Sequence, residues 1–429
     1  MPTLYQQHQF NVSRSPLFEP EAALPRSAPA RPAVRLIAYY LPQFHPIAEN
    51  DAWWGAGFTE WTNVGKALPR YVGHRQPRPP ADLGFYDLRD PEVLRRQAEL
   101  ARRAGVHGFC IHDYWFSGRK VLETPLQLLL SRPDIDLPFC LNWANENWSR
   151  RWDGSDDDIL LEQRYDPDDA EGYLRSILPA LRDPRYIRVG GRPLLMLYRP
   201  KLLPEPRRWL ERWRAFLVAE GVGDPYLVMP QSFGDVDPRV HGFDAAAGFP
   251  PHNAGWTLPD ERTSLDLLDA GFQGRASSYA EMARGSLANA TDAFRLLPGV
   301  CPEWDSEPRK PGRGASFYGA SPAAYGDWLE AAGRQAAGAP NPDERIVFIN
   351  AWNEWAEGAH LEPDRHYGHA FLAETRRALD RLSGDVQACP PRPQAATTPL
   401  MHTAPSPRLR AVNRLRRLAR RAGFVGRTR

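Results

Sequence analysis

Short apolar runs recur along most of this chain, and helix-like stretches separate most of them. Eight runs are predicted to be strands: Val34–Tyr40, His107–Asp113, Pro138–Trp143, Pro193–Tyr198, Tyr226–Gln231, Phe243–Phe249, Gly299–Glu303 and Arg345–Ala351. The predicted helices include Pro91–Ala104, Asp168–Leu181, Arg207–Glu220, Ser278–Ala290, Pro322–Ala337 and Gly368–Leu382. Strands that alternate with helices over roughly 350 residues predict a (β/α)8 TIM barrel with long insertions in the loops that follow the strands.

Local signals agree with these helix boundaries. Pro91 and Pro322 suit the first turn of a helix, where the backbone needs no amide hydrogen. Gly105 and Gly221 directly follow two of the predicted helices and can end them. The alternative fold is a doubly wound open sheet, but the segment after the first strand, Tyr39–Gln43, lacks the glycine-rich turn that binds phosphate in such sheets.

The composition changes at both ends of the barrel segment. Residues 1–33 predict a disordered leader, residues 34–383 one domain, and residues 384–429 a linker with a basic tail. Apolar side chains recur at helical spacing among the arginines of the tail, at Leu409, Val412, Leu415 and Leu418. This pattern predicts peripheral contact with an anionic membrane through residues 400–429, and a disordered solubilising tail is the alternative.

Composition also excludes several classes of function. The formal net charge of +2 gives no overall attraction to nucleic acid. The cysteines form no CxxC pair, and His45, His74 and His112 match no metal-ligand spacing, so we expect neither a metal nor another cofactor. Residues 1–35 lack the apolar core of a signal peptide, and no apolar run approaches the length of a membrane span. We therefore expect a cytoplasmic protein, either free or peripheral at the inner membrane face.

The run that begins at Asn350 carries two carboxylates, Glu354 and Glu357, interleaved with two tryptophans directly after the last predicted strand. Carboxyl pairs make and break glycosidic bonds by acid and base catalysis, and indole rings bind the C–H faces of sugars. An adjacent indole also desolvates a carboxyl and raises its pKa, which suits a general acid. We therefore predict that Glu354 and Glu357 are catalytic. The alternative is a helix N-terminus, whose dipole attracts acidic residues.

Polar and aromatic residues gather at the carboxyl ends of the predicted strands and in the loops that follow. In a barrel these ends meet at one face, where active sites lie. We therefore predict that the following residues contact the substrate in one cleft with the two glutamates: Tyr39, Tyr40, His45, Trp54, Glu60, Trp61, His112, Tyr114, Trp115, Asn142, Trp143, Asn145, Glu146, Trp148, Arg151, Tyr198, Trp352 and Asn353.

Parts of this set have plainer alternatives. Residues 142–148 offer amides, a carboxylate and indoles to a sugar, but they also fit a polar loop with one or two buried tryptophans. Residues 51–61 form either a sugar platform or lid, or a hydrophobic plug over the barrel mouth. Arg151 would bind a phosphate or uronate, or would pair with a neighbouring acid.

Four long motifs resemble the WbsX-type proteins, and they occur in order along residues 34–380. The motifs are Ile37–Pro46, Gly57–Val64, Asn142–Trp148 and Asn350–Gly358. That family is assigned to gene clusters for bacterial O-antigen and other surface polysaccharides, and it is commonly described as a glycosyltransferase family. Its domain is also called glycoside hydrolase family 99-like, after the endo-α-mannosidases.

The family 99 resemblance implies a (β/α)8 barrel that acts on a mannose-like sugar with retention of configuration. Carried over by spacing, Glu354 would remove the proton from the 2-hydroxyl, whose oxygen then closes a 1,2-anhydro ring. Glu357 would serve first as general acid and then as general base. The resemblance also implies a difference: this chain has Ala356 at the position where the hydrolases have a His.

We therefore expect an enzyme of cell-surface polysaccharide biosynthesis that makes or trims a glycosidic bond. Its substrate would be a glycan or a lipid-linked oligosaccharide, and its mechanism a retaining one. One alternative is a sugar-nucleotide-dependent glycosyltransferase with a metal at Asp156–Asp158, although such acidic runs are also typical of solvated loops. The other is a barrel that binds a glycan without turnover.

Overall fold

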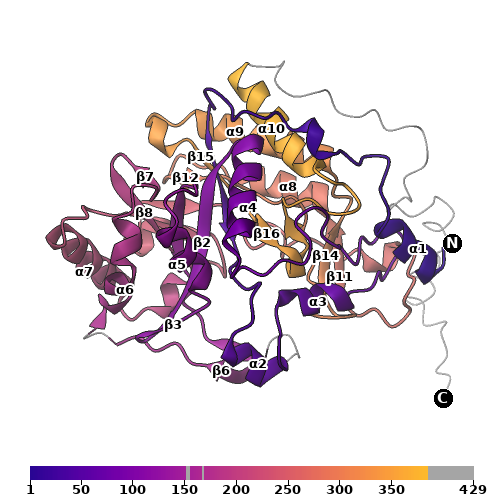
Figure 1. Ribbon diagram of the computed structural model, residues 1–429, viewed down its shortest axis with the longest axis horizontal. Helices are drawn as coiled ribbons and strands as arrows, with labels where there is room; N and C mark the ends of the chain where they lie inside the picture. Colours follow the sequence, from indigo (N-terminus) through magenta and orange to yellow (C-terminus); the bar gives the residue numbers. More distant parts are fainter. Residues whose placement is uncertain (151–154, 167–168, 385–429) are drawn as a thin grey trace, which may run out of the picture.

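The computed structural model describes residues 1–150, 155–166 and 169–384. Its main sheet curls into a nearly closed parallel barrel with the strand order β12-β10-β9-β8-β4-β2-β1-β15-β13 (Figure 1). The strand bounds are β1 Arg35–Tyr40, β2 Val106–Phe116, β4 Phe139–Trp143, β8 Arg192–Leu197, β9 Tyr226–Pro230, β10 Ala245–Ala247, β12 Leu296–Leu297, β13 Gly299–Val300 and β15 Ile346–Ile349. The predicted TIM barrel is confirmed, and the open-sheet alternative is wrong.

The barrel closes through a strand position that a single proline divides. Pro298 lies between β12 and β13 and has no amide hydrogen to donate, so the ladder is split into two short pieces. The Leu297 carbonyl accepts a hydrogen bond from Gly248 beside β10 at 2.8 Å, and the Pro298 carbonyl accepts one from Phe348 of β15 at 2.9 Å. The predicted strand Gly299–Glu303 corresponds only to the second piece for this reason.

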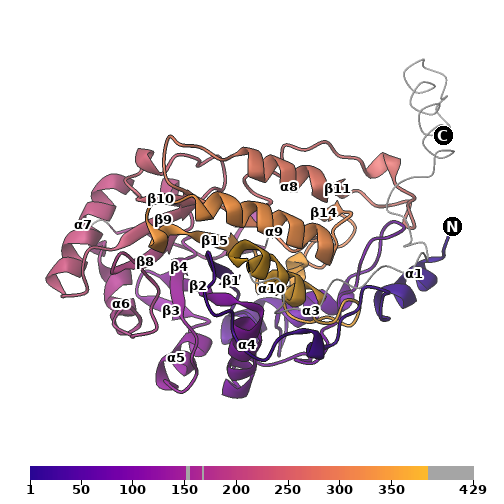
Figure 2. The same cartoon turned by 90° about the horizontal axis from the view of Figure 1, so that it is seen from above.

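Helices surround the strands (Figure 2). Their bounds are α4 Pro91–Ala104, α5 Thr124–Ser131, α6 Gly172–Leu181, α7 Pro206–Ala219, α8 Tyr279–Ala288, α9 Pro322–Ala337 and α10 Ala370–Ser383. The side chain of Asp90 caps the start of α4, and α4 ends at Gly105, whose φ of +85° favours glycine. α10 packs against both α4 and α9, so the last helix completes the outer layer.

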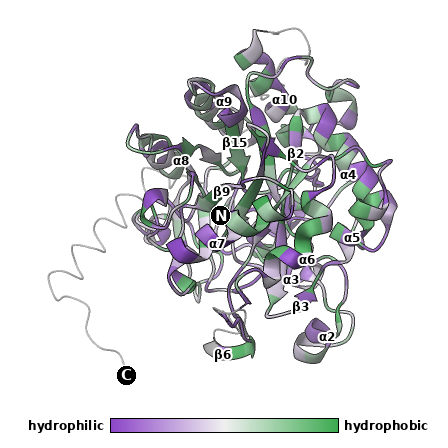
Figure 3. Ribbon diagram, turned by 90° about the vertical axis from the view of Figure 1, so that its left-hand side faces the viewer, coloured by the Kyte–Doolittle hydropathy of each residue, from purple (hydrophilic) through white to green (hydrophobic). Residues whose placement is uncertain are grey.

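The barrel strands are mostly apolar because both of their faces are covered. Every residue of β4 and β15 is buried. Colouring by hydropathy shows hydrophobic strands inside, with hydrophilic residues spread over the surrounding helices (Figure 3). A parallel strand between a helix layer and a filled barrel interior has no solvent face, which is why these strands are visible in the sequence as continuous apolar runs.

Short elements lie in the insertions beyond the carboxyl ends of the strands. They are α2 Ala48–Trp54, α3 Glu60–Lys66, β3 Arg119–Val121, β5 Trp148–Arg150, β6 Ser155–Leu161, β11 Arg275–Ser278 and β14 Ala315–Tyr318. α2 and the β5–β6 hairpin lie side by side at the lower edge of Figure 1, where the ring centroids of Trp53 and Trp148 are 5.9 Å apart. These insertions build the surroundings of the site described below.

Residues 1–33 are not the disordered leader that their composition predicts. They contain the helix α1 Leu4–Asn11, which lies beside the β11–β14 pair in Figure 1. The Asn11 side-chain amide donates to the backbone carbonyls of residues 74 and 76 at 2.8 and 2.7 Å. Glu19 pairs with Arg377 of α10 at 2.5 Å. Specific polar contacts with the barrel hold this segment, and composition alone gives no sign of such contacts.

Residues 385–429, which include the predicted membrane-contacting segment, lie outside the described residues. Within the described ranges, no helix combines the length and the apolarity that a membrane crossing requires.

Candidate active site

A cavity of about 490 Å³ opens at the carboxyl ends of the barrel strands. Its volume is in the range of small-molecule sites, about 300 to 1,000 Å³. The wall receives side chains from the carboxyl-terminal half of β2 and from the loops after β1, β4, β8, β9, β10, β13 and β15. Segments far apart in the sequence therefore share one hollow, as expected for a barrel.

The acidic run after β15 forms a short hairpin over this cavity. Asn353–Glu354 pairs as strand β16 with Ala359–His360, and a single 3-10 turn, Trp355–Glu357, connects them. Gly358 closes the turn with a left-handed φ of +61°. Glu354 and Glu357 both line the cavity. The alternative of acids at the N-terminus of a longer helix is therefore wrong.

Arg309, from the loop after β13, bridges three carboxylates in this wall. Its guanidinium bonds to Glu60 at 3.0 Å, to Glu357 at 2.6 Å and to Glu354. Glu60, the first residue of α3, is fully buried, and the Arg309 side chain is 15% exposed. We call Arg309 and its three partner acids the acid cluster. A buried cluster of three acids and one cation carries excess negative charge, so it favours a bound proton.

The pKa of Glu354 is raised to about 8 by burial, and the charges of Glu357 and Glu60 add to this effect. Arg309 acts in the opposite direction but does not cancel it. Burial alone would lower the pKa of Arg309, but the three carboxylates outweigh it and raise that pKa. At neutral pH, Glu354 therefore holds a proton in most molecules.

Glu357 is fixed by contacts from the β13 loop. The indole Nε1 of Trp304 donates to its carboxylate at 3.2 Å. The backbone amide of Asp305 donates to its carbonyl at 2.6 Å. Arg78 donates to the carbonyl of the next residue, Gly358. The backbone at the carboxyl end of the turn is thus held from outside the acidic run.

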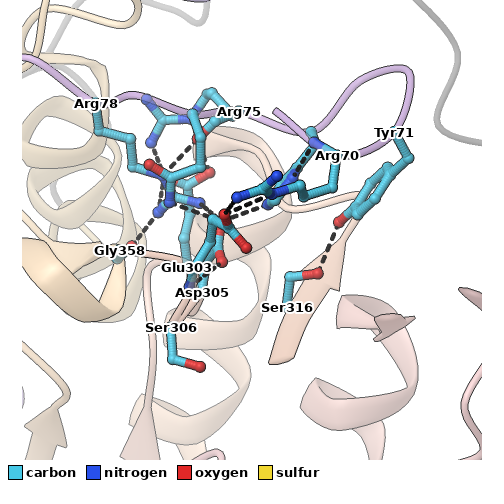
Figure 4. A network of polar contacts seen from close by, with 12 residues as sticks. Arg70, Tyr71, Arg75, Arg78, Glu303, Asp305, Ser306, Ser316 and Gly358 are labelled. Atoms are coloured by element: carbon cyan, nitrogen blue, oxygen red, sulfur yellow. Dashed lines mark hydrogen bonds and ion pairs between the residues drawn. The ribbon is translucent and has the colours of Figure 1, made fainter. Parts of the chain in front are cut away.

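A buried polar network supports these contacts from behind (Figure 4). His74 and Gln76 bond to the carboxylate of Asp305 at 2.7 and 2.8 Å. Arg75 pairs with Glu303 and, at 2.7 Å, with Asp364. Burial would raise the pKa of Asp305, but His74 and Arg78 outweigh it and hold that pKa at about 2. The network joins residues 70–78 to the β13 loop, which carries Arg309.

Aromatic side chains form two walls on the cavity. Trp53, Tyr114 and Trp148 form one, with the Tyr114 and Trp148 rings 5.2 Å apart. Trp256 and Trp304 belong to the other, with their rings 5.0 Å apart and nearly perpendicular. Trp256 is 37% exposed, so part of its indole is free to meet a ligand. Flat apolar faces beside polar groups suit the binding of sugar rings.

Two histidines of the wall are neutral. Burial lowers the pKa of both His112 and His252 to about 4, although the charge of Glu357 opposes the shift in each case. The amide nitrogen of Asn142 donates to Nδ1 of His112 at 3.1 Å, which leaves the ring proton of His112 on Nε2. His112 is therefore suited to donate one hydrogen bond rather than to carry charge.

The cavity wall contains part of the set that the sequence predicts. The predicted residues on the wall are Trp54, His112, Tyr114, Glu146, Trp148, Tyr198, Glu354 and Glu357. Glu60 lies behind the wall and reaches the site through Arg309. Arg151 lies outside the described residues.

Other predicted contact residues do not line the cavity, so the prediction that they contact the substrate directly is corrected. They are Tyr39, Tyr40, His45, Trp61, Trp115, Asn142, Trp143, Asn145, Trp352 and Asn353. Strand alternation explains part of the error. Along β2, His112 and Tyr114 face the cavity, whereas Trp115 points the other way and is buried.

The tryptophans beside the catalytic candidates are core residues rather than sugar platforms. Trp352 and Trp355 are fully buried, and their indoles donate to the carboxylate of Glu362 at 2.9 and 2.6 Å. Tyr86 and Gln97 donate to the same carboxylate at 2.8 and 2.6 Å. We call Glu362 and these four donors the indole cage. Its role is to lock the acidic run onto the barrel.

Sequence reasoning missed the part of the wall that follows β9, β10 and β13. This part includes Phe233, Phe249, His252, Trp256, Trp304, Ser306, Arg309, Lys310 and Arg313. The short run Glu303–Asp305 places a tryptophan between two acids, but it was not singled out in the sequence. A further signal is the position of Trp304 and Asp305 at the end of a predicted strand, where polar residues gather in the rest of the barrel.

The acidic run Asp156–Asp158 lies on strand β6 of the β5–β6 hairpin, and Asp158 is exposed. Across the part of the chain that the structure describes, the group with metal-like spacing of acids and histidine is Glu21, Asp82 and His369. It does not line the cavity, and Glu21 already pairs with Arg96 and Arg103.

Comparison with known proteins gives a family match and a relative. The profile of the family described as Glycosyltransferase WbsX matches residues 36–375. The uncharacterized protein WxcX of Xanthomonas campestris pv. campestris strain B100 is 49% identical over 360 residues, which is 84% of this chain. The match covers 51% of that relative, so this chain spans about half the length of the curated relatives it matches.

Two solved structures have a similar fold. The glycoside hydrolase family 99 endo-α-mannosidase from Bacteroides thetaiotaomicron, in complex with BIS-TRIS-propane, superposes with a TM-score of 0.51 and 16% identity, over 82% of this chain and 98% of that one. A glycoside hydrolase-like protein gives a TM-score of 0.52 with 15% identity, over 86% of this chain and 97% of that one. At these identities the likeness concerns the fold alone.

Proposed function

This chain belongs to the glycosyltransferase WbsX family, and we propose that it makes or trims a glycosidic bond in bacterial cell-surface polysaccharide. The family match supports a carbohydrate-active enzyme, and the barrel fold is consistent with one. The proposed substrate is an O-antigen-type glycan, free or lipid-linked, that presents a mannose-like sugar. The proposed chemistry is a retaining reaction with two glutamates.

One observation supports this proposal above the others. Glu354 and Glu357 line the same cavity, at the carboxyl face of a barrel, between two aromatic walls. A sugar ring that stacks on an aromatic side chain of this cavity would have both carboxyls in the wall around it. A second, smaller cavity beside β12 has no acid among the described residues of its wall.

The proposed reaction has two steps. First, Glu354 takes the proton of the 2-hydroxyl, O2 attacks the anomeric carbon, and the bond to the leaving oxygen breaks as Glu357 protonates that oxygen. In the second step, water or a sugar hydroxyl attacks the anomeric carbon and gives its proton to Glu357. The 1,2-anhydro ring opens, and O2 regains its proton from Glu354. Both carboxyls thus return to their starting protonation state. Attack by water trims the glycan, whereas attack by a sugar hydroxyl makes a new glycosidic bond.

The scheme starts with Glu354 ionised and Glu357 protonated, whereas in the free protein at neutral pH Glu354 holds a proton in most molecules, because its pKa is raised. A sugar hydroxyl is a weak acid, and a carboxylate with a pKa of about 8 is a stronger base than an ordinary one. The cost is that only about a tenth of the molecules hold Glu354 ionised at neutral pH. Arg309 bonds to both carboxylates in the free protein, so a bound sugar must share or displace this cation, and Glu60 would anchor the cation when it is displaced.

The experiment is a screen of mannose-configured and O-antigen-derived oligosaccharides, followed by NMR of the anomeric protons. We expect turnover of at least one glycan, with retained configuration in the product, and no product from Glu357→Gln. Inversion of configuration would contradict the two-step scheme. Glu146→Gln is the matched control, because Glu146 also lines the cavity but pairs with Arg199 instead of Arg309.

The acid cluster also favours a second candidate, a glycan-binding barrel without turnover. Acids that share an arginine and have perturbed pKa values also occur in structural ion-pair networks without a catalytic role. This candidate predicts that glycans bind to the wild type and to Glu357→Gln alike, and that no product forms in either. The sugar-nucleotide alternative predicts nucleotide diphosphate binding by calorimetry that EDTA abolishes.

A further inference from the structure

Two cations line the cavity without a partner among the described residues. Lys310 and Arg313 both lie on the loop after β13, both are exposed, and both line the cavity. Neither side chain forms a hydrogen bond or ion pair with any residue that the structure describes. The other charged groups of the wall are satisfied, because Glu146 pairs with Arg199, and Arg309 pairs with Glu354 and Glu357.

The loop that carries these cations is held in one shape. Buried Glu307 accepts hydrogen bonds from the amide of Gly312 at 3.1 and 3.0 Å and pairs with Arg70 at 2.5 Å. Gly312 has a left-handed φ of +72°, which a residue with a side chain rarely adopts. The amide of Arg313 donates to the carbonyl of Lys310 at 2.9 Å, so one turn contains both residues.

The charge of the wall indicates the kind of ligand that this turn accepts. The carboxylates of the wall have cationic partners, whereas Lys310 and Arg313 have no acidic partner among the described residues, so this turn presents positive charge to the cavity. Lysine and arginine bind phosphate and carboxylate oxygens through charge-assisted hydrogen bonds. Because the turn is already anchored, its backbone loses little entropy when a ligand binds. This favours ligand binding by Lys310 and Arg313 more than a flexible loop would.

We propose that Lys310 and Arg313 form an anion subsite for a phosphate or carboxylate group carried by the glycan substrate. The inference rests on the proposed function, and it narrows the substrate class to negatively charged glycans. The anionic oxygens have two sources in such molecules, namely the phosphate or diphosphate of a carrier and the carboxylate of an acidic sugar.

Isothermal titration calorimetry on the full chain at low ionic strength separates these sources. The probes are inorganic pyrophosphate, glucuronate and, as the neutral control, glucose. We expect pyrophosphate or glucuronate to bind the wild type, and Lys310→Gln/Arg313→Gln to weaken that binding by at least about tenfold. Salt at about 0.5 M should weaken wild-type binding as well, since the cations are exposed. Binding of pyrophosphate alone indicates phosphate, and binding of glucuronate alone indicates an acidic sugar.

The control pair is Arg26→Gln/Arg102→Gln, which removes the same charge from two exposed positions outside the cavity. It should bind the anions like the wild type. The subsite proposal is overturned if neither anion binds the wild type, or if Lys310→Gln/Arg313→Gln binds as tightly as the control pair. The probes need no turnover, so a failure of the glycosidic chemistry would leave this result intact. Turnover of a glycan by an enzyme that ignores both anions would remove only the subsite.

Discussion

The acid cluster and the indole cage both bury a carboxyl with a raised pKa, yet only one of them meets a cavity. Burial raises the pKa of Glu354 to about 8 and that of Glu362 to about 7. Glu362 accepts hydrogen bonds from two indoles, a phenol and an amide, and it faces the core. Glu354 has an arginine partner and lines the cavity. A perturbed pKa and nearby tryptophans therefore do not identify a catalytic acid unless a substrate can reach it.

The largest expected effect is on turnover when the acid cluster loses its base. Glu354→Gln keeps the shape of the side chain but cannot accept a proton, so kcat should fall by about 10²- to 10⁴-fold. Glycan binding, measured by calorimetry, should stay within a few fold. A variant with wild-type kcat would remove Glu354 from the mechanism.

The same variant should also change how stability depends on pH. The folded pKa of Glu354 is above its unfolded value, so the folded state binds the extra proton between pH 4.5 and about 8. Wild-type stability from this group is complete below that window and is lost as pH rises through it. Urea unfolding at several pH values should show a weaker decline in Glu354→Gln. Identical slopes in both proteins would contradict a raised pKa.

Removal of the bridging cation should affect both stability and chemistry. Arg309→Gln leaves three carboxylates, two of them buried, without their partner, which should cost about 3 to 5 kcal/mol. The loss should grow at higher pH, when more of these acids are ionised in the unfolded chain. The pH at which kcat/KM rises, near 8 in the wild type, should move upward, because Arg309 lowers the pKa of Glu354. An unmoved pH profile would show that Arg309 does not act on Glu354.

In the indole cage, the expected effect is on stability alone. Glu362→Gln turns an amide NH₂ toward donors such as Trp355 and Tyr86, and each unsatisfied buried donor costs about 1 to 3 kcal/mol. Thermal and urea unfolding should show the loss, whereas kcat of the folded fraction should remain close to that of the wild type. A loss of kcat without a loss of stability would contradict the structural role of Glu362 and indicate a role in turnover instead.

The smallest expected effect comes from the aromatic wall. Trp256→Ala removes a partly exposed indole from the cavity and should raise KM or the glycan Kd by about tenfold, which corresponds to roughly 1.4 kcal/mol of stacking. Its stability should change little. Trp352→Ala is the matched core variant and should lower stability by about 3 to 5 kcal/mol. Equal stability losses would place Trp256 in the core as well.

The sequence predicted the barrel because its strands are continuous apolar runs, and it located the acidic run because that run follows a strand. The sequence did not show that His112 and Glu354 line the cavity whereas Trp115 and the tryptophans beside Glu354 are buried in the core. The direction of each side chain decides this, and neighbouring residues point in opposite directions. The sequence did not predict Arg309 as a site residue for another reason. Its partners Glu60 and Glu354 are far from it in the sequence, and only the closed barrel brings them together.

Labelling by a mannose-configured epoxide analogue, read by intact-protein mass spectrometry and peptide mapping, tests most directly whether the acid cluster handles a sugar. The account predicts one label per chain on Glu354 or Glu357, prevented by the glycan substrate and absent when both are changed to Gln. No label on the wild type, or a label that persists in that double variant, would contradict it.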